Sequence, residues 1–301
     1  MALDNSLSES VFCHRLDKNL ARVTDNTWPR ITIVTPSFNQ RRYLEQTILS
    51  VLNQNYPNLE YIIIDGGSTD GSLEIIRKYE HYLAFWTSGA DEGQSAALAA
   101  GFRRATGEIF AWINSDDVYP QSVLRKVGEI MHREKQVDVC YGNMHVLDEE
   151  GQIVAERRLI DYPGWLLRLG FRYGGLGIYQ PASFWRRSLY ESVGGLNPSL
   201  FFCMDNDLFI RFVLSDGKFR FVRAPLYGFR IHPDSKTGMR KNIGDEEFKT
   251  LIEKYQLDWT SLKARCIQTS IRVYRGWMYC MQGDGLYLTK RLLPSPLNWV
   301  P

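Results

Sequence analysis

The sequence predicts an α/β fold in which a mixed, mostly parallel central sheet is flanked by helices. Two observations predict it. Short apolar runs rich in β-branched residues alternate along the chain with segments whose apolar residues recur at helical spacing. The strand runs are apolar at consecutive positions, as in strands that are covered by helices on both faces. We therefore expect a Rossmann-like domain, followed by a helical tail at the C-terminal end.

The first half of the chain carries these segments in regular alternation. Residues 31–35 form a β-branched run that stops at Pro36, and the apolar spacing over 43–53 predicts a helix. The later segments are a strand at 61–64, a helix at 72–79 that Ser72 would cap, a helix at 94–104, a strand at 109–113, a helix at 122–135 and a strand at 137–141. This order predicts βαβ units and a parallel sheet.

The second half is less regular. Residues 142–200 are rich in glycine and aromatic residues, which indicates an adaptable binding loop. A helix is expected at 205–214 and a strand at 219–222, and apolar residues recur at helical intervals after position 260. We divide the chain into an N-terminal arm (1–29), a catalytic domain (30–250) and a basic, aromatic helical tail (251–301).

Composition excludes several classes of protein. The 301 residues include 36 Lys and Arg against 34 Asp and Glu, and this net charge of +2 argues against a dedicated nucleic-acid binder. The five cysteines are scattered, which argues against a structural zinc site and favours reduced thiols in the cytoplasm. The first 26 residues lack the apolar core of a signal peptide, and no run of about 20 apolar residues predicts a membrane span. Peripheral contact with the inner face of the membrane stays open.

Carboxylates recur directly after the expected strands, at Asp65, Asp91, Asp116 and Asp117. The carboxyl ends of parallel strands meet at one edge of a sheet, where ligands of this fold class bind. A carboxylate there accepts a hydrogen bond from a base or a sugar, or binds Mg²⁺ or Mn²⁺ together with phosphate oxygens. A single Asp in a loop is usually a solvated turn residue. Four at successive strand ends favour a nucleotide and metal site.

Several motifs resemble family 2 glycosyltransferases with the GT-A fold. They are Ile33–Gln40, Ile64–Ser72, Ile113–Asp117, Gln180–Phe184, Val193–Asn197, Met204–Arg211 and Arg230–Pro233, within a resemblance from about Arg30 to Lys236. The resemblance implies an inverting transferase that moves a sugar from a nucleotide-diphosphate donor, with UDP or dTDP favoured, using Mn²⁺ or Mg²⁺. The implied acceptor is a hydroxyl of a glycan or a polyprenyl-linked lipid, and the implied process is cell-surface polysaccharide biosynthesis.

The resemblance also implies roles for the donor-binding residues. Pro36 and Phe38 would line the base pocket. Asp65 would accept the N3–H of a uracil-type base, and Asp91 would contact the base or nearby donor atoms. Asp116 would hold the ribose or the donor sugar.

The remaining roles concern the metal and the acceptor. By the resemblance, Asp117 matches the last carboxylate of the metal motif, His232 matches a metal or diphosphate ligand, and Asp205 matches the catalytic base. These roles suit the reaction, because a cation stabilises the leaving diphosphate and a base deprotonates the acceptor hydroxyl. Asp205 could instead be only a helix N-cap. Asp207 and Arg211, one helical turn apart, can pair.

Three questions stay open at this point. Residues 89–94 and Asn206 depart from the family pattern, which leaves donor selectivity and acceptor fit undetermined. The main functional alternative is a non-catalytic nucleotide-sugar-binding scaffold or sensor, and an NAD-linked dehydrogenase is disfavoured because the glycine-rich fingerprint is missing. The segment 255–301 either docks on an anionic membrane surface or packs on the catalytic domain.

Overall fold

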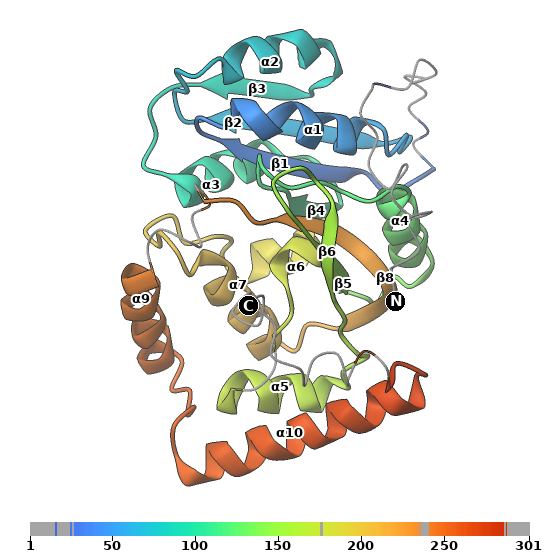
Figure 1. Ribbon diagram of the computed structural model, residues 1–301, viewed down its shortest axis with the longest axis vertical. Coiled ribbons are helices and arrows are strands. Elements are labelled where there is room, and N and C mark those ends of the chain that lie inside the picture. Colours follow the sequence, from blue (N-terminus) through green and yellow to red (C-terminus); the bar gives the residue numbers. More distant parts are fainter. Residues whose placement is uncertain are drawn as a thin grey trace.

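The computed structural model describes residues 27–174, 177–233 and 241–285, together with Leu16, Asp25, Ser235 and Tyr287. Most of the expected N-terminal arm therefore lies outside the described residues, as does the end of the tail after Tyr287. The described residues form one sheet of eight strands with helices on both faces (Figure 1). This architecture confirms the predicted fold class.

The strands are β1 (Ile31–Ser37), β2 (Leu59–Asp65), β3 (Phe85–Ser88), β4 (Ile109–Trp112), β5 (Val139–Leu147), β6 (Ile153–Arg157), β7 (Ser183–Arg186) and β8 (Phe219–Arg230). The helices are α1 (Arg41–Leu52), α2 (Ser72–Tyr79), α3 (Gln94–Arg104), α4 (Val123–Arg133), α5 (Gly164–Tyr173), α6 (Arg187–Ser192), α7 (Met204–Leu214), α9 (Lys241–Lys254) and α10 (Leu262–Met281). Two short 3₁₀ segments, Glu80–Tyr82 and Gln180–Ala182, complete the list.

The strand order is β3-β2-β1-β4-β7-β5-β6, and β8 pairs with β5 outside this path. Strands β1 to β4 are parallel, with Ser37 opposite Asp65 in the register of β1 and β2. Strand β7 runs antiparallel to both β4 and β5, while β8 runs parallel to β5. The carboxyl ends of β1, β2 and β4 therefore lie together, at what we call the C-terminal edge of the sheet.

Side chains of the central strands alternate between two hydrophobic cores. In β1, Ile31 and Ile33 pack in the core beneath α1, α2 and α4. Val34 points the other way, into the core beneath α3, α6 and α7. Both faces of β1 are thus buried, which explains why its sequence is apolar at consecutive positions.

The structure corrects several expectations about local structure. Residues 142–200 are not an adaptable loop, because they contain β6, α5, β7 and α6, and β7 is fully buried between β4 and β5. Strand β3 is the strand before Asp91, for which no residue range was predicted, and β8 extends well beyond 219–222. Ser72 begins α2 but does not cap it; its backbone N–H and hydroxyl donate instead to Asp70, at 3.0 and 2.7 Å.

The C-terminal helices cross the expected domain boundary. The boundary at 250/251 falls inside α9, which packs beside α7, and α10 then runs along one end of the molecule beneath α5 (Figure 1). Among the described residues, no helix combines the length and the apolar character that crossing a bilayer requires.

Close packing of α3 on β1 yields a prediction. A Cβ added to Gly101 would lie 2.4 Å from Cγ1 of Val34. We expect Gly101→Ala to lower the free energy of unfolding by about 1–3 kcal/mol, because overpacking outweighs the helix propensity of alanine. Urea denaturation measures this. Gly164→Ala, which meets no atom within 4 Å, is the control and should not destabilise; equal stability of both variants would contradict the packing argument.

Candidate active site

Three loops meet at Gly66, at the C-terminal edge of the sheet. A Cβ on this residue would lie 3.3 Å from Cδ2 of Phe38 and 3.2 Å from Oδ2 of Asp91. The Phe38 ring is 60% exposed although it is large and apolar, and so it offers a stacking surface for a planar ligand. Pro36 is buried within β1, opposite Ile64 of β2. The structure thus brings Phe38 and Asp91 together at Gly66, whereas Pro36 is a buried strand residue.

Asp65 organises the loop that follows β2. Its buried carboxylate accepts hydrogen bonds at Oδ2 from the N–H of Gly67 (3.1 Å), the N–H of Ser68 (2.9 Å) and the hydroxyl of Ser88 (2.7 Å). Oδ1 accepts from the Ser68 hydroxyl at 2.6 Å. Among the described residues Oδ1 accepts only this one hydrogen bond, and the Asp65 side chain is 1% exposed, so its main structural role is to order the loop after β2.

Asp116 faces His232, which follows the end of β8. Oδ2 of Asp116 and Nε2 of His232 are 3.0 Å apart. The side chain of Asp116 is 18% exposed and that of His232 is 1% exposed, so the pair reaches solvent through the carboxylate. The His232 ring packs on Tyr43 with ring centroids 4.7 Å apart. Its Nδ1 is buried and has no hydrogen-bond partner among the described residues.

Asp117, the neighbouring residue, is buried and fully engaged. Oδ1 accepts from the backbone N–H of Arg230 at 2.7 Å, and Oδ2 accepts from the Tyr227 hydroxyl at 2.7 Å and from Nδ2 of Asn114 at 3.1 Å. Burial raises the pKa of Asp117, the charge of Asp116 raises it further, and these hydrogen bonds act in the opposite direction. The geometry does not favour the expectation that Asp117 binds a cation, because its oxygens serve to join the β4 end to β8.

The buried side chain of Arg230 also contacts the segment that contains Asp116 and Asp117. Arg230 is 2% exposed, and its Nε donates to the backbone carbonyl of Asp116 at 2.8 Å. Its two Nη atoms donate to the carbonyl of Glu149 at 3.0 Å and to Oε1 of Gln46 at 2.7 Å. Burial lowers the pKa of Arg230, and the charge of Asp117 opposes that effect. Sequence reasoning missed this role, although Arg230 stands in the same motif as His232.

The pair of Asp116 and His232 could hold a divalent cation only with help from a ligand. Within the described ranges, no three His, Cys, Asp or Glu side chains gather as a metal site would require. Mg²⁺ and related hard cations commonly take one or two protein ligands and complete their shell with water and substrate phosphates. The residues present therefore fit a cation that arrives with a diphosphate.

Asp205 is the second residue of α7 and is partly exposed. Cys203 occupies the position directly before the helix. The alternative that Asp205 is only an N-cap is therefore wrong.

The segment before α7 lies against the start of α3. The Ser95 hydroxyl donates to the carbonyl of Leu200, and a Cβ on Gly93 would lie 3.6 Å from the Phe201 ring. Gln94 in turn donates from Nε2 to Oδ1 of Asn114 at 2.8 Å. The start of α3 thus touches both the segment that leads to Asp205 and the segment that leads to Asp116. The start of α3 therefore links two segments that are about 90 residues apart in the sequence.

Glu247 of α9 positions the start of α7. Its carboxylate accepts from three consecutive backbone N–H groups, those of Phe201 (2.6 Å), Phe202 (2.8 Å) and Cys203 (2.8 Å). An anion is favourable there, because the first N–H groups of a helix lack intrahelical partners and carry partial positive charge. Sequence reasoning missed Glu247, since nothing local marks a glutamate on one helix as the partner of another.

Asp207 provides a second joint between α7 and α9. It is buried and accepts from Nε of Arg211 at 3.0 Å, which confirms the predicted pairing across one helical turn. From α9 it accepts Nζ of Lys254 at 3.1 Å and the Tyr255 hydroxyl following the helix at 2.7 Å. Burial alone would raise the pKa of Asp207, but the Tyr255 hydrogen bond and the Arg211 charge outweigh burial and lower it. The carboxylate is therefore held ionised.

Comparisons with known proteins agree with this geometry. The family model described as "Glycosyl transferase family 2" matches residues 32–194. A glycosyltransferase of Haemophilus influenzae is 38% identical over 141 residues, which cover 44% of this chain and 56% of that protein. A Bacillus subtilis protein named "Putative teichuronic acid biosynthesis glycosyltransferase TuaG" is 38% identical over 109 residues, or 35% of this chain and 43% of the relative.

Two solved structures share the fold. TarS 1–349 of S. aureus in complex with UDP-GlcNAc has a TM-score of 0.59 and 16% identity, and the match covers 80% of this chain and 71% of that one. The mannosyltransferase PcManGT of Pyrobaculum calidifontis, in complex with GDP-Man and Mn²⁺, has a TM-score of 0.57 and 16% identity, with coverage of 90% and 78%. At this identity the likeness concerns the fold, which is the GT-A fold.

The chain belongs to glycosyl transferase family 2, since the family model matches more than half of it. The matched parts span about half the length of the curated relatives. Asp205, His232 and Glu247 all lie beyond the matched residues 32–194.

The hydrogen bonds that Glu247 accepts from the segment before α7 yield a prediction. We expect Glu247→Ala to speed hydrogen exchange at the amides of residues 201–203 and to lower the free energy of unfolding by about 1–3 kcal/mol, because three donors lose a charged acceptor. Hydrogen-exchange mass spectrometry measures the first effect. Glu246→Ala, an exposed neighbour on α9, is the matched control; equal exchange in both variants would show that Glu247 does not order this segment.

Proposed function

We propose that this protein transfers a sugar from a nucleotide-diphosphate sugar to an acceptor hydroxyl, with inversion at the anomeric carbon. Three features support the proposal: an exposed aromatic ring after β1, a carboxylate paired with a histidine after β4 and β8, and a carboxylate in the first turn of α7, whose preceding segment contacts the start of α3. The first suits a base, the second a cation-bound diphosphate, and the third an incoming alcohol.

The donor base would stack on Phe38, with Asp91 beside it. Asp65 would accept the N3–H of the base through Oδ1. Only a base with a donor at that position suits a carboxylate acceptor, which favours uridine or thymidine diphosphate. Family membership and the complexes of the two structural neighbours, one with UDP-GlcNAc and one with GDP-Man, support a nucleotide-sugar donor, and the first of them supports uridine.

The diphosphate would sit beside Asp116 and His232, which would hold Mn²⁺ or Mg²⁺. When bound, the cation would stabilise the charge that develops on the leaving diphosphate. This assignment changes two expectations, since the sequence pointed to Asp117 as the metal carboxylate and to Asp116 as the sugar ligand. The partial exposure of Asp116 and the burial of Asp117 support giving the metal role to Asp116 in place of Asp117. Asp117 and Arg230 then act as positioning residues that hold Asp116.

Asp205 would remove the proton from the acceptor hydroxyl as that oxygen attacks the anomeric carbon. A positioned base contributes on the order of 10²- to 10⁴-fold to such a reaction. A single displacement inverts the anomeric centre. The acceptor is proposed to be a glycan or a polyprenyl-linked lipid in cell-envelope polysaccharide synthesis, which the name of the Bacillus subtilis relative supports. The free thiols of the described cysteines support a reducing, cytoplasmic location.

The base role predicts a split between binding and turnover. Asp205→Asn should bind the donor as tightly as the natural protein, while transfer falls by about 10²-fold or more, because the amide cannot accept the proton. Donor binding is measured by calorimetry and transfer by release of nucleoside diphosphate, after a screen of nucleotide sugars with Mn²⁺ or Mg²⁺.

Asp216→Asn, an exposed carboxylate after α7, is the matched control and should retain activity. Undiminished transfer by Asp205→Asn would show that Asp205 is not the catalytic base. Donor binding without any turnover in the natural protein would instead favour the non-catalytic scaffold.

The metal assignment predicts different outcomes for two adjacent residues. Asp116→Asn should fold normally but lose stimulation by Mn²⁺, because the carboxylate that faces His232 is gone. Asp117→Asn should retain Mn²⁺ stimulation and lose about 1–3 kcal/mol in free energy of unfolding, because buried donors lose a charged acceptor. Manganese titration of donor hydrolysis and urea denaturation measure both. A stable Asp117→Asn variant that no longer responds to Mn²⁺ would indicate that Asp117 binds the metal, as the sequence predicted.

A further inference from the structure

The helix α10 packs on the domain through one face. Ala264, Ile271 and Tyr279 are buried, and the Tyr279 hydroxyl donates to the carbonyl of Arg158 at 2.7 Å. Nε2 of Gln268 donates to the carbonyl of Tyr173, at the end of α5, at 2.7 Å. One of the two alternatives for the tail is therefore realised: this helix packs on the catalytic domain.

The opposite face of α10 is apolar and exposed. Four large apolar side chains lie on it, with exposed fractions of 79% for Leu262, 69% for Val273, 56% for Trp277 and 67% for Met281. Their spacing of 11, 4 and 4 residues places them on one side of a helix, and exposed Cys266 lies between the first two. We call these five residues the outer face. An exposed apolar stripe of this kind, here interrupted only by the small polar residues Thr269 and Ser270, is typical of an interaction surface.

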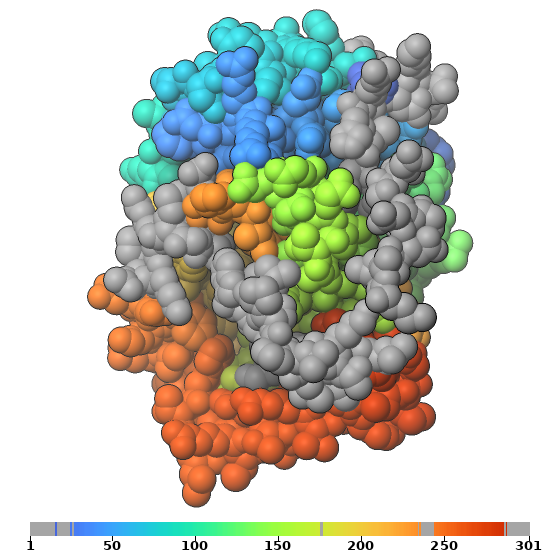
Figure 2. All heavy atoms as spheres, viewed as in Figure 1, coloured from blue at the N-terminus to red at the C-terminus, as the bar shows by residue number. Residues whose placement is uncertain are grey.

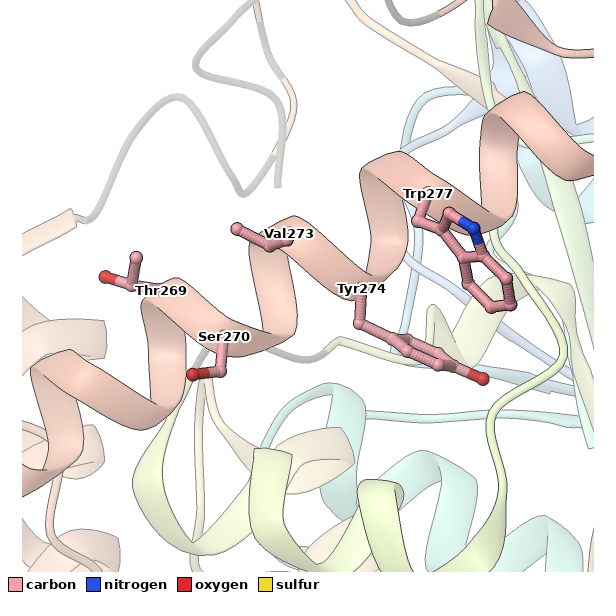
Figure 3. A pocket seen from close by; sticks show the side chains of 5 residues that line it. All are labelled: Thr269, Ser270, Val273, Tyr274 and Trp277. Carbon is pink, nitrogen blue, oxygen red and sulfur yellow. The ribbon is translucent and has the colours of Figure 1, made fainter.

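A shallow hollow borders the outer face. It has a volume of about 440 Å³ and is lined by Val273 and Trp277 of the outer face and by Thr269, Ser270 and Tyr274 beside them (Figure 3). The rings of Tyr274 and Trp277 are neighbours, with centroids 6.0 Å apart. The helix forms the lower border of the molecule in the view of Figure 2.

Basic side chains flank the stripe. Residues 262–281 contain Lys263, Arg265, Arg272 and Arg275 and no acidic residue. At 3.6 residues per turn, Arg265 and Arg272 lie on one side of the outer face, and Lys263 lies on the other, where its ammonium is 5.1 Å from the centroid of the Tyr173 ring. All three are exposed. An apolar stripe with tryptophan between rows of cations is the pattern of a helix that lies in the plane of an anionic bilayer surface.

We propose that the outer face of α10 docks on an anionic lipid bilayer. Val273 and Trp277 enter the boundary between headgroups and acyl chains, and the flanking cations contact anionic headgroups. A second copy of the chain is a poorer partner, because two such helices would bring the six like charges that flank their outer faces together. A nucleic acid would leave the apolar stripe without a partner.

The docking rests on α10 alone and not on the proposed transferase activity. It would hold the C-terminal helices at the membrane surface, where a lipid-linked acceptor is found. Point substitutions on the outer face test it better than truncation, because removal of α10 would also expose the core that Ile271 and Tyr279 complete.

The test is co-sedimentation of the full chain with vesicles of phosphatidylcholine, with and without phosphatidylglycerol. We expect binding only to the anionic vesicles, and loss of it at high salt. The triple variant Lys263→Gln/Arg265→Gln/Arg272→Gln should weaken binding on the order of 100-fold, at about fivefold for each cation. Val273→Asp/Trp277→Asp should weaken binding about tenfold or more, because two apolar side chains that docking would bury in the bilayer are lost.

Val154→Asp, at a 45% exposed valine on β6, is the matched control and should bind as the natural protein does. Thermal unfolding of each variant shows whether it is folded. Equal binding to neutral vesicles, or no binding to either kind, would overturn the proposal. So would a change from dimer to monomer on Val273→Asp/Trp277→Asp, since the outer face would then be a contact between copies. Donor hydrolysis without vesicles should be the same in all variants, which separates this test from that of the transferase function.

Discussion

The candidate site depends on one buried carboxylate, that of Asp117. Removing a charge from water costs several kcal/mol unless donors replace the lost hydration. The donors here are a tyrosine hydroxyl and a backbone N–H of β8, together with the side chain of Asn114. Val118 also forms a bridge with Gly228. Strand β8 must therefore end beside the β4 end, and this brings His232 to Asp116.

A second constraint acts from the C-terminal side. Helix α9 accepts three backbone N–H groups before α7 through Glu247 and meets α7 again at Asp207. The carboxylates of Glu247 on α9 and Asp207 on α7 thus join the two helices. The functional unit consequently extends past the region that the family model matches, because the base candidate and its supports lie after residue 194.

Helix α10 shows how one element can serve both stability and contact. Its inner face completes a small core with α5 and the first residues of β5 and β8. This core is built around Tyr141, Ile271 and Tyr279. Its outer face has no such role, yet it carries large apolar side chains that are more than half exposed. Basic residues accompany the outer side, so that the charge and the apolar stripe point to the same kind of partner.

Local pattern was sufficient for the alternating strands and helices of residues 31–141, for carboxylates at strand ends and for the pairing of Asp207 with Arg211. It could not tell which of two adjacent aspartates is buried, nor that Arg230 and Glu247 support the site, nor that the described part of residues 142–200 contains β6, α5, β7 and α6. Neighbouring side chains after a strand point in opposite directions, and their surroundings come from β8 and α9, about 100 residues or more further along. Burial and hydrogen bonding between such distant segments arise only when the chain is packed, so local sequence carries no signal of them.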